Sequence, residues 1–168
     1  MVINLFKYSL IFIVSVLLQV LIFNNILVAR MIAPFFYILF IILLPFDTPR
    51  ALLLFLSFLL GLIVDIFTNT PGVHASASLT IGFLRPYVLQ LISSRETLES
   101  VAAPRVENMG LSWFAGYTAF LVVIHHFFLF IIEAFTFNDI LITLFRIVLS
   151  SILSIILIVL SQFLIFRK

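Results

Sequence analysis

Long apolar stretches separated by short polar breaks make up most of this chain. Six such segments can be marked off, at about residues 5–23, 31–44, 51–67, 75–92, 111–135 and 140–166. A helix needs roughly 20 apolar residues to cross a bilayer, so the pattern predicts about six transmembrane helices. The segment at 31–44 is short for this length, and Pro34 lies in its first turn, where proline is tolerated.

The composition places these segments in lipid. Of 168 residues, 64% are hydrophobic and 10% are charged, and the mean hydropathy is +1.36, whereas a soluble domain carries about 25% charged residues. The sequence therefore predicts an all-α integral membrane protein, with residues 1–168 forming one compact transmembrane domain. The basic residues are scattered, which argues against nucleic-acid binding, and the absence of Cys excludes disulfides and thiol chemistry.

Charge asymmetry predicts the orientation. With six spans both termini lie on one side, and that side collects seven basic residues, namely Lys7, Arg50, Arg85, Arg95, Arg105, Arg167 and Lys168. The other side collects Arg30 and Arg146. Because Lys and Arg are enriched in cytoplasmic loops, both termini and the polar segment 93–110 are expected in the cytoplasm.

The third and fourth apolar segments are predicted to form a tight hairpin. Ser57, Gly61 and Asp65 are spaced four residues apart, so they share one helix face on which another backbone can approach closely. The fourth segment offers a matching surface of small residues, namely Ala75, Ser76, Ser78, Thr80 and Gly82. The turn between them contains Pro71-Gly72, in which proline presets φ and glycine accepts a positive φ.

Two ionisable residues of this hairpin need an explanation, because a charge inside a span is costly. Asp65 is either a structural acid, hydrogen-bonded to loop N–H groups or to Ser and Thr of the next helix, or a carboxylate that binds a partner or ligand. Arg85 is expected to snorkel to the headgroups, and Pro86 is expected to end or kink the helix.

Polar residues of the other segments suggest contacts between helices. Glu133 and Arg146 lie near the ends of consecutive helices and are predicted to form an interhelical ion pair. His125 and His126 point about 100° apart on a helix, so they are interpreted as interface residues and not as a metal site. Gln19 is expected to make hydrogen bonds between helices.

The central stretch resembles the bacterial rod shape-determining family MreD. The resemblance lies in Gly61-x3-Asp65, Pro71-Gly72-x2-Ala75 and Leu84-Arg85-Pro86, together with the length and the multispanning layout of the chain. It implies no cofactor and no catalytic residue. The residues that carry over are motif residues: Gly61, Asp65, Pro71, Gly72, Ala75, Arg85 and Pro86.

The resemblance also implies a setting and partners. Members of this family are non-enzymatic scaffolds of the elongation machinery in the bacterial cytoplasmic (inner) membrane. They bind the bitopic protein MreC and so connect MreB filaments to peptidoglycan synthesis by a SEDS glycosyltransferase and a class B penicillin-binding protein. The family is similar in fold to the substrate-binding subunits of energy-coupling-factor transporters, and the sequence leaves open whether the chain forms homo-oligomers.

Two other functions remain open from the residues. A substrate-binding subunit of a vitamin-type transporter would need a polar cavity near the outer side, for which five residues are available, namely Asp65, Asn69, His74, Glu133 and Arg146. A membrane enzyme acting on a lipid would use Asp65 and His74 as acid and base, but no third group completes a catalytic set.

Overall fold

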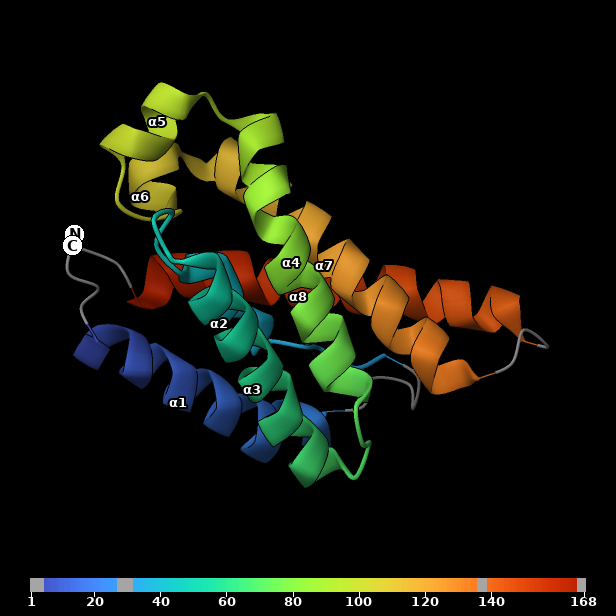
Figure 1. The fold of residues 1–168 in the computed structure, drawn as a ribbon. Coiled ribbons are helices and arrows are strands. Elements are labelled where there is room, and N and C mark those ends of the chain that lie inside the picture. Colours follow the sequence, from blue (N-terminus) through green and yellow to red (C-terminus); the bar gives the residue numbers. More distant parts are fainter. Residues whose placement is uncertain (1–4, 27–31, 136–138, 166–168) are drawn as a thin grey trace.

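The computed structural model describes residues 5–26, 32–135 and 139–165, and this part of the chain is helical, with no strand. The long helices are α1 (Leu5–Leu21), α3 (Arg50–Thr68), α4 (Val73–Ile92), α7 (Leu111–Ala134) and α8 (Ile140–Ile165) (Figure 1). The short ones are η1 (Phe23–Asn25), α2 (Ile38–Leu43), α5 (Arg95–Ser100) and α6 (Val106–Met109).

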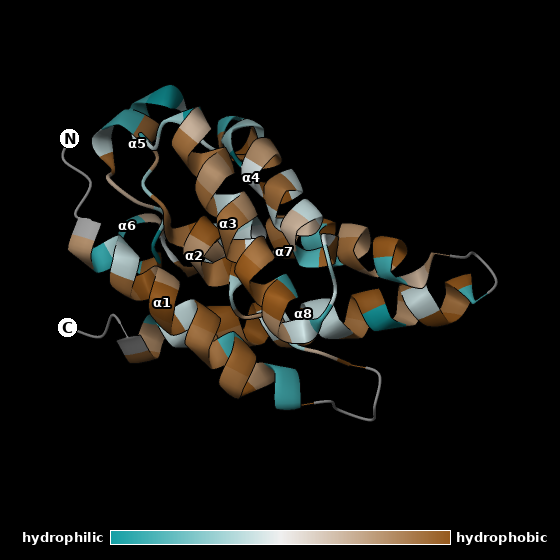
Figure 2. Cartoon of the chain, turned by 60° about the horizontal axis from the view of Figure 1, so that its bottom comes forward, coloured by the Kyte–Doolittle hydropathy of each residue, from teal (hydrophilic) through white to brown (hydrophobic). Residues whose placement is uncertain are grey.

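Four of the described helices are long and apolar enough to cross a membrane, namely those at Phe6–Asn25, Arg50–Thr68, Leu111–Ala134 and Ile140–Leu164. Apolar residues cover these helices, whereas polar residues collect on α5 (Figure 2). The helix α4 has 20 residues but is more polar, because it carries His74, Arg85 and several Ser and Thr. The all-α fold is confirmed and suits a multi-pass membrane protein, but the count of six transmembrane helices is not confirmed.

The long helices form two antiparallel pairs, α3 with α4 and α7 with α8, and α4 also packs on α7 (Figure 1). One end of the bundle carries α5 and α6, and we call it the α5–α6 end. The first turns of α1 lie at this end, because Tyr8 hydrogen-bonds Arg105. The opposite end carries the turn between α3 and α4, and we call it the hairpin end. Arg30, Arg167 and Lys168, which enter the predicted charge asymmetry, lie outside the described residues.

The second apolar segment does not form the expected helix. Residues 32–37 are non-helical, and α2 covers only Ile38–Leu43. Nevertheless Phe35–Leu44 is the most buried stretch of the described chain, with every residue at most 7% exposed. We call residues 32–44 the central segment. Pro34 is one reason why a helix is absent at its start, because proline lacks an N–H and restricts the residue before it.

Polar side chains of α1 satisfy the backbone of the central segment. The Gln19 Oε1 atom accepts hydrogen bonds from the N–H groups of Phe36 (2.7 Å) and Tyr37 (3.3 Å). The Gln19 Nε2 atom donates to the carbonyl of Pro34 at 3.1 Å. Irregular backbone at membrane depth is tolerated only where such partners exist. Gln19 therefore bonds to backbone, in contrast to the contact between helices that the sequence predicts.

The helix α8 supports the same segment from the other side. The N–H of Ala33 donates to Ser150 Oγ at 3.3 Å, and the N–H of Phe35 donates to Ser154 Oγ at 2.9 Å. These serines are four residues apart, so they lie on one face of α8. Side chains from the first and last long helices thus hold the central segment between them.

The hairpin of α3 and α4 is as close as the small residues predict. A Cβ atom added to Gly61 would lie 2.6 Å from the Cα of Ala75, and one added to Gly82 would lie 2.8 Å from the Cβ of Ser57. Real Cβ atoms do not come so close to other heavy atoms. The backbone of α4 thus requires glycine at position 61, and the side chain of Ser57 leaves room only for glycine at position 82.

A substitution in α8 tests the role of its serines. Ser154→Ala leaves the buried N–H of Phe35 without an acceptor, which we expect to cost about 1–3 kcal/mol. The measurement is thermal unfolding of the purified protein in detergent. Ser151→Ala is the matched control, because Ser151 is 2% exposed and its Oγ atom has no hydrogen-bond partner among the described residues. Equal falls in Tm for both variants would contradict this role.

Candidate functional site

The side chain of Asp65, in the last turn of α3, is the centre of the hairpin end. Its Oδ1 atom accepts hydrogen bonds from the His74 N–H (2.9 Å) and the Thr70 hydroxyl (3.0 Å). Its Oδ2 atom accepts from the N–H groups of Gly72 (3.1 Å) and Ala75 (2.9 Å). The His74 ring contributes a further contact, between Nδ1 and Oδ1, at 3.0 Å. Both carboxylate oxygens are therefore occupied.

These contacts make Asp65 the cap of the neighbouring helix. The first N–H groups of a helix have no partner within it, and its N-terminus is positive. The N-cap position of α4 is Gly72, which has no side chain to accept from them. A carboxylate from α3 fills this place, and its side chain is only 2% exposed. The geometry fits the structural interpretation of Asp65.

The turn between the two helices uses the residues that its conformation requires. Asn69 ends α3 with φ of 56°, and its N–H donates to the Asp65 carbonyl. Gly72 has φ of 87°, a value at which glycine carries no steric penalty. Pro71 stands between them. The predicted Pro-Gly turn thus brings the start of α4 within reach of Asp65.

Arg85 lies inside the bundle, at 1% exposure, so the prediction that it snorkels to the headgroups is wrong. Its guanidinium donates to the carbonyls of Leu44 and Pro45, and its Nε atom donates to Tyr117 Oη at 2.8 Å. The Tyr117 hydroxyl in turn donates to the carbonyl of Ile42 at 3.3 Å. The last carbonyls of α2 need external donors, and this need explains why Arg85 is buried.

Pro86 does not end α4, which continues to Ile92. Of the two outcomes expected for Pro86, the helix end is therefore wrong, and the kink stays a prediction. A proline removes a single N–H donor, and Val88 and Leu89 beyond it are buried in the bundle. Their packing favours continuation of the helix past the proline.

The three histidines of the chain gather around the ring of Phe35 in the central segment. The ring centroids of His74, His125 and His126 lie 5.5, 6.0 and 5.2 Å from that of Phe35. His125 Nε2 is 2.7 Å from the hydroxyl of Tyr37. This cluster joins the central segment to α4 and α7.

The contacts of His126 define its tautomer. Its Nδ1 atom lies 2.8 Å from the carbonyl of Val122 and must donate to it, so Nε2 accepts from the Ser154 hydroxyl at 3.1 Å. His125 and His126 are thus interface residues, as the sequence predicts. Within the described residues no group of three His, Asp or Glu side chains is arranged to hold a metal ion.

Glu133 and Arg146 lie in contact across α7 and α8, with 3.2 Å between Glu133 Oε2 and Arg146 Nη2. The guanidinium carbon of Arg146 also lies 4.5 Å from the centroid of the Phe130 ring. The pair is therefore distinct from the site of Asp65. The polar residues that were candidates for one outer cavity thus bond in two separate groups.

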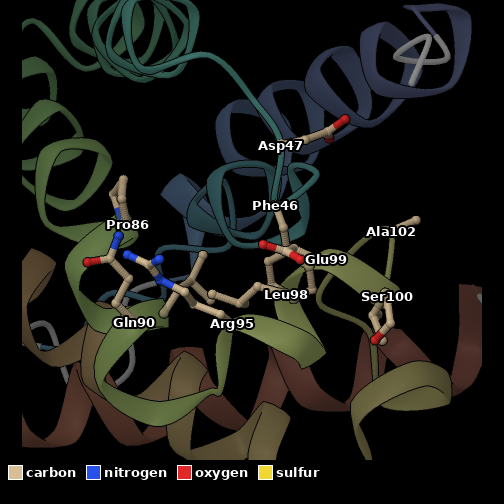
Figure 3. A pocket seen from close by; sticks show the side chains of 11 residues that line it. Phe46, Asp47, Pro86, Gln90, Arg95, Leu98, Glu99, Ser100 and Ala102 are labelled. Carbon is tan, nitrogen blue, oxygen red and sulfur yellow. The ribbon is translucent and has the colours of Figure 1, made fainter.

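A cavity of about 620 Å³ lies at the α5–α6 end (Figure 3). Its walls come from α4, α5 and the turn after α2: Phe46, Asp47, Pro86, Leu89, Gln90, Arg95, Leu98, Glu99, Ser100, Val101 and Ala102. The backbone closes one side, where the N–H of Phe46 donates to the carbonyl of Ala102 at 3.3 Å. The motif residue Pro86 is thus part of this wall.

The geometry explains several polar residues that the sequence left without a specific role. Tyr37 and Tyr117 were not singled out, although both bond the central segment or its partners. The sequence feature that could have indicated these roles is the number of Ser and Gln residues on apolar helices, because contacts between helices alone need few of them.

Comparison with protein-family models, with curated proteins and with solved structures finds no match for this chain.

The cap on α4 leads to a prediction. Asp65→Asn replaces one accepting oxygen with a donor, which leaves at least one buried N–H of α4 unpaired and weakens charge-assisted bonds. We expect a loss of about 2 kcal/mol or more, measured as a fall in Tm in detergent. Asp47→Asn, an exposed acid in the turn after α2, is the control, and a similar fall for both variants would refute the cap.

The ion pair of Glu133 and Arg146 leads to a second prediction about stability. Glu133→Gln and Arg146→Gln are each expected to lower Tm, by an amount corresponding to at most about 1 kcal/mol, because partly exposed pairs contribute little. The double variant should be no less stable than the weaker single variant, since both remove the same interaction. Strictly additive losses in thermal unfolding would show that the two side chains act independently.

Proposed function

We propose that this chain is a non-enzymatic scaffold of the bacterial elongation machinery, resembling MreD. The observation that carries the proposal is the junction of α3 and α4. Asp65 accepts hydrogen bonds there from the N–H groups of Gly72 and Ala75, and Gly61 packs against the backbone of His74 and Ala75. The spacing of the motif thus has a physical cause, because these residues serve the fold of the hairpin.

The expected partner is an MreC-like bitopic membrane protein. Through it the chain would connect MreB-like filaments with a SEDS glycosyltransferase and a class B penicillin-binding protein. The proposed location is the bacterial inner membrane, with the α5–α6 end in the cytoplasm. Lys7, Arg50, Arg95 and Arg105 belong to this end and support that orientation by the positive-inside rule.

A second candidate is the substrate-binding subunit of a small-molecule transporter of the vitamin type. It is favoured by the central segment, because discontinuous helices at membrane depth often form transporter binding sites. The proposed similarity to energy-coupling-factor subunits belongs to the same argument. Against it, the polar groups near the central segment bond to its own backbone, as Arg85 and Gln19 do.

One purification experiment distinguishes the scaffold function from the transporter function. The tagged chain is crosslinked gently in its native membrane, solubilised in mild detergent and analysed by mass spectrometry. Recovery of a bitopic MreC-like protein with cell-wall synthases is the expected result. Recovery of transporter ATPases with a coupling protein, or of a stoichiometric small molecule, would overturn the scaffold in favour of the transporter.

A pair of variants tests the placement of the partner surface on the hairpin. Gly61→Ala adds a methyl group where α4 leaves no room, so we expect it to disturb the hairpin and to lower recovery of the partner several-fold while membrane insertion survives. Gly116→Ala on α7 is the matched control, because a Cβ there meets no atom within 4 Å. Equal recovery with both variants would place the partner surface elsewhere.

A further inference from the structure

An apolar groove opens sideways between α1 and α3 at the α5–α6 end. It holds about 320 Å³, and α1 contributes Tyr8, Ser9, Phe12 and Ile13 to its wall. Its floor is the central segment, through the buried side chains of Phe40 and Leu44. The second wall comes from α3 and the turn before it, namely Thr48, Leu52, Leu56 and Leu59.

The depth of this groove matches one leaflet of a bilayer. The positions from Thr48 to Leu59 cover on the order of 15 Å at the rise of a helix, and half of the hydrocarbon core is also about 15 Å thick. The rings of Phe12 and Phe40 pack edge to face, with centroids 5.0 Å apart, and join α1 to the floor. The length of the groove therefore suits one leaflet of a bilayer.

Its two ends differ in chemistry. The inner part is lined by Leu, Ile and Phe, whereas the outer end carries the polar side chains of Tyr8, Ser9 and Thr48. Tyr8 hydrogen-bonds Arg105 and lies near the charge of Asp47, and the charges of Arg105 and Glu107 both act on Lys7. Cations and carboxylates thus both lie near the polar end of the groove.

We propose that this groove is a binding site for one glycerophospholipid of the leaflet at the α5–α6 end. One acyl chain lies along Leu52, Leu56 and Leu59, and the polar headgroup lies at the end that carries Tyr8, Ser9 and Thr48. A transmembrane helix of a partner is about 10–12 Å wide and crosses both leaflets, so a groove of this volume and depth favours an acyl chain. This proposal does not rest on the proposed function.

Native mass spectrometry tests the site. After extensive washing in mild detergent, the wild-type protein is expected to retain one phospholipid per chain. Leu56→Trp fills the groove and should reduce retention at least tenfold. Leu160→Trp is the matched control, because Leu160 on α8 is 51% exposed and does not line the groove.

Two results would overturn the proposal. One is a wild-type protein that carries no phospholipid, including a protein that carries a second polypeptide instead. The other is equal retention by the two tryptophan variants.

A second measurement covers the case in which Leu56→Trp does not fold. Ile13→Trp places a reporter at the rim of the groove, and Leu160→Trp again serves as the control. Both variants are reconstituted in phosphatidylcholine vesicles with a minor fraction of phospholipid brominated in its acyl chains. Stronger quenching of the reporter at position 13 supports the site, and equal quenching at both positions refutes it.

Discussion

The backbone of residues 32–44 passes through the interior of the bundle and is helical only over Ile38–Leu43, and several buried polar side chains of the core are bonded to it. Lipid offers no hydrogen bonds, so the polar groups of such a segment need partners within the protein. Gln19 supplies them from α1, Ser154 from α8 and Arg85 from α4. These three polar residues, which are costly in a membrane, are thus explained by the needs of one irregular segment.

The helix α4 connects this segment with the hairpin end. Its first N–H groups are capped by Asp65 of α3, and Gly61 allows the two helices to touch backbone to backbone. Farther along the same helix, Arg85 reaches the carbonyls at the end of α2.

The different roles of buried polar and exposed apolar side chains are relevant to function. The buried polar groups serve mainly the protein's own backbone, as Asp65 and Arg85 illustrate, whereas apolar side chains cover the outward faces of the long helices. Such a molecule offers its outer faces and the α5–α6 end for contacts with lipid and with other proteins. A scaffold in the membrane needs surfaces of this kind, and we propose that the groove between α1 and α3 also holds one lipid.

The sequence by itself determined the membrane class, the five long helices and the close hairpin, because hydropathy, glycine spacing and Pro71-Gly72 act over short distances along the chain. It also predicted the contact of Glu133 with Arg146, since both lie near the connection between α7 and α8. Only the tertiary structure decided that residues 32–37 are not helical and that Arg85 is buried. Both depend on partners more than 15 residues away, such as Ser154 for Phe35 and Leu44 for Arg85. A local pattern does not encode such distant hydrogen bonds, because their geometry exists only once the helices have packed.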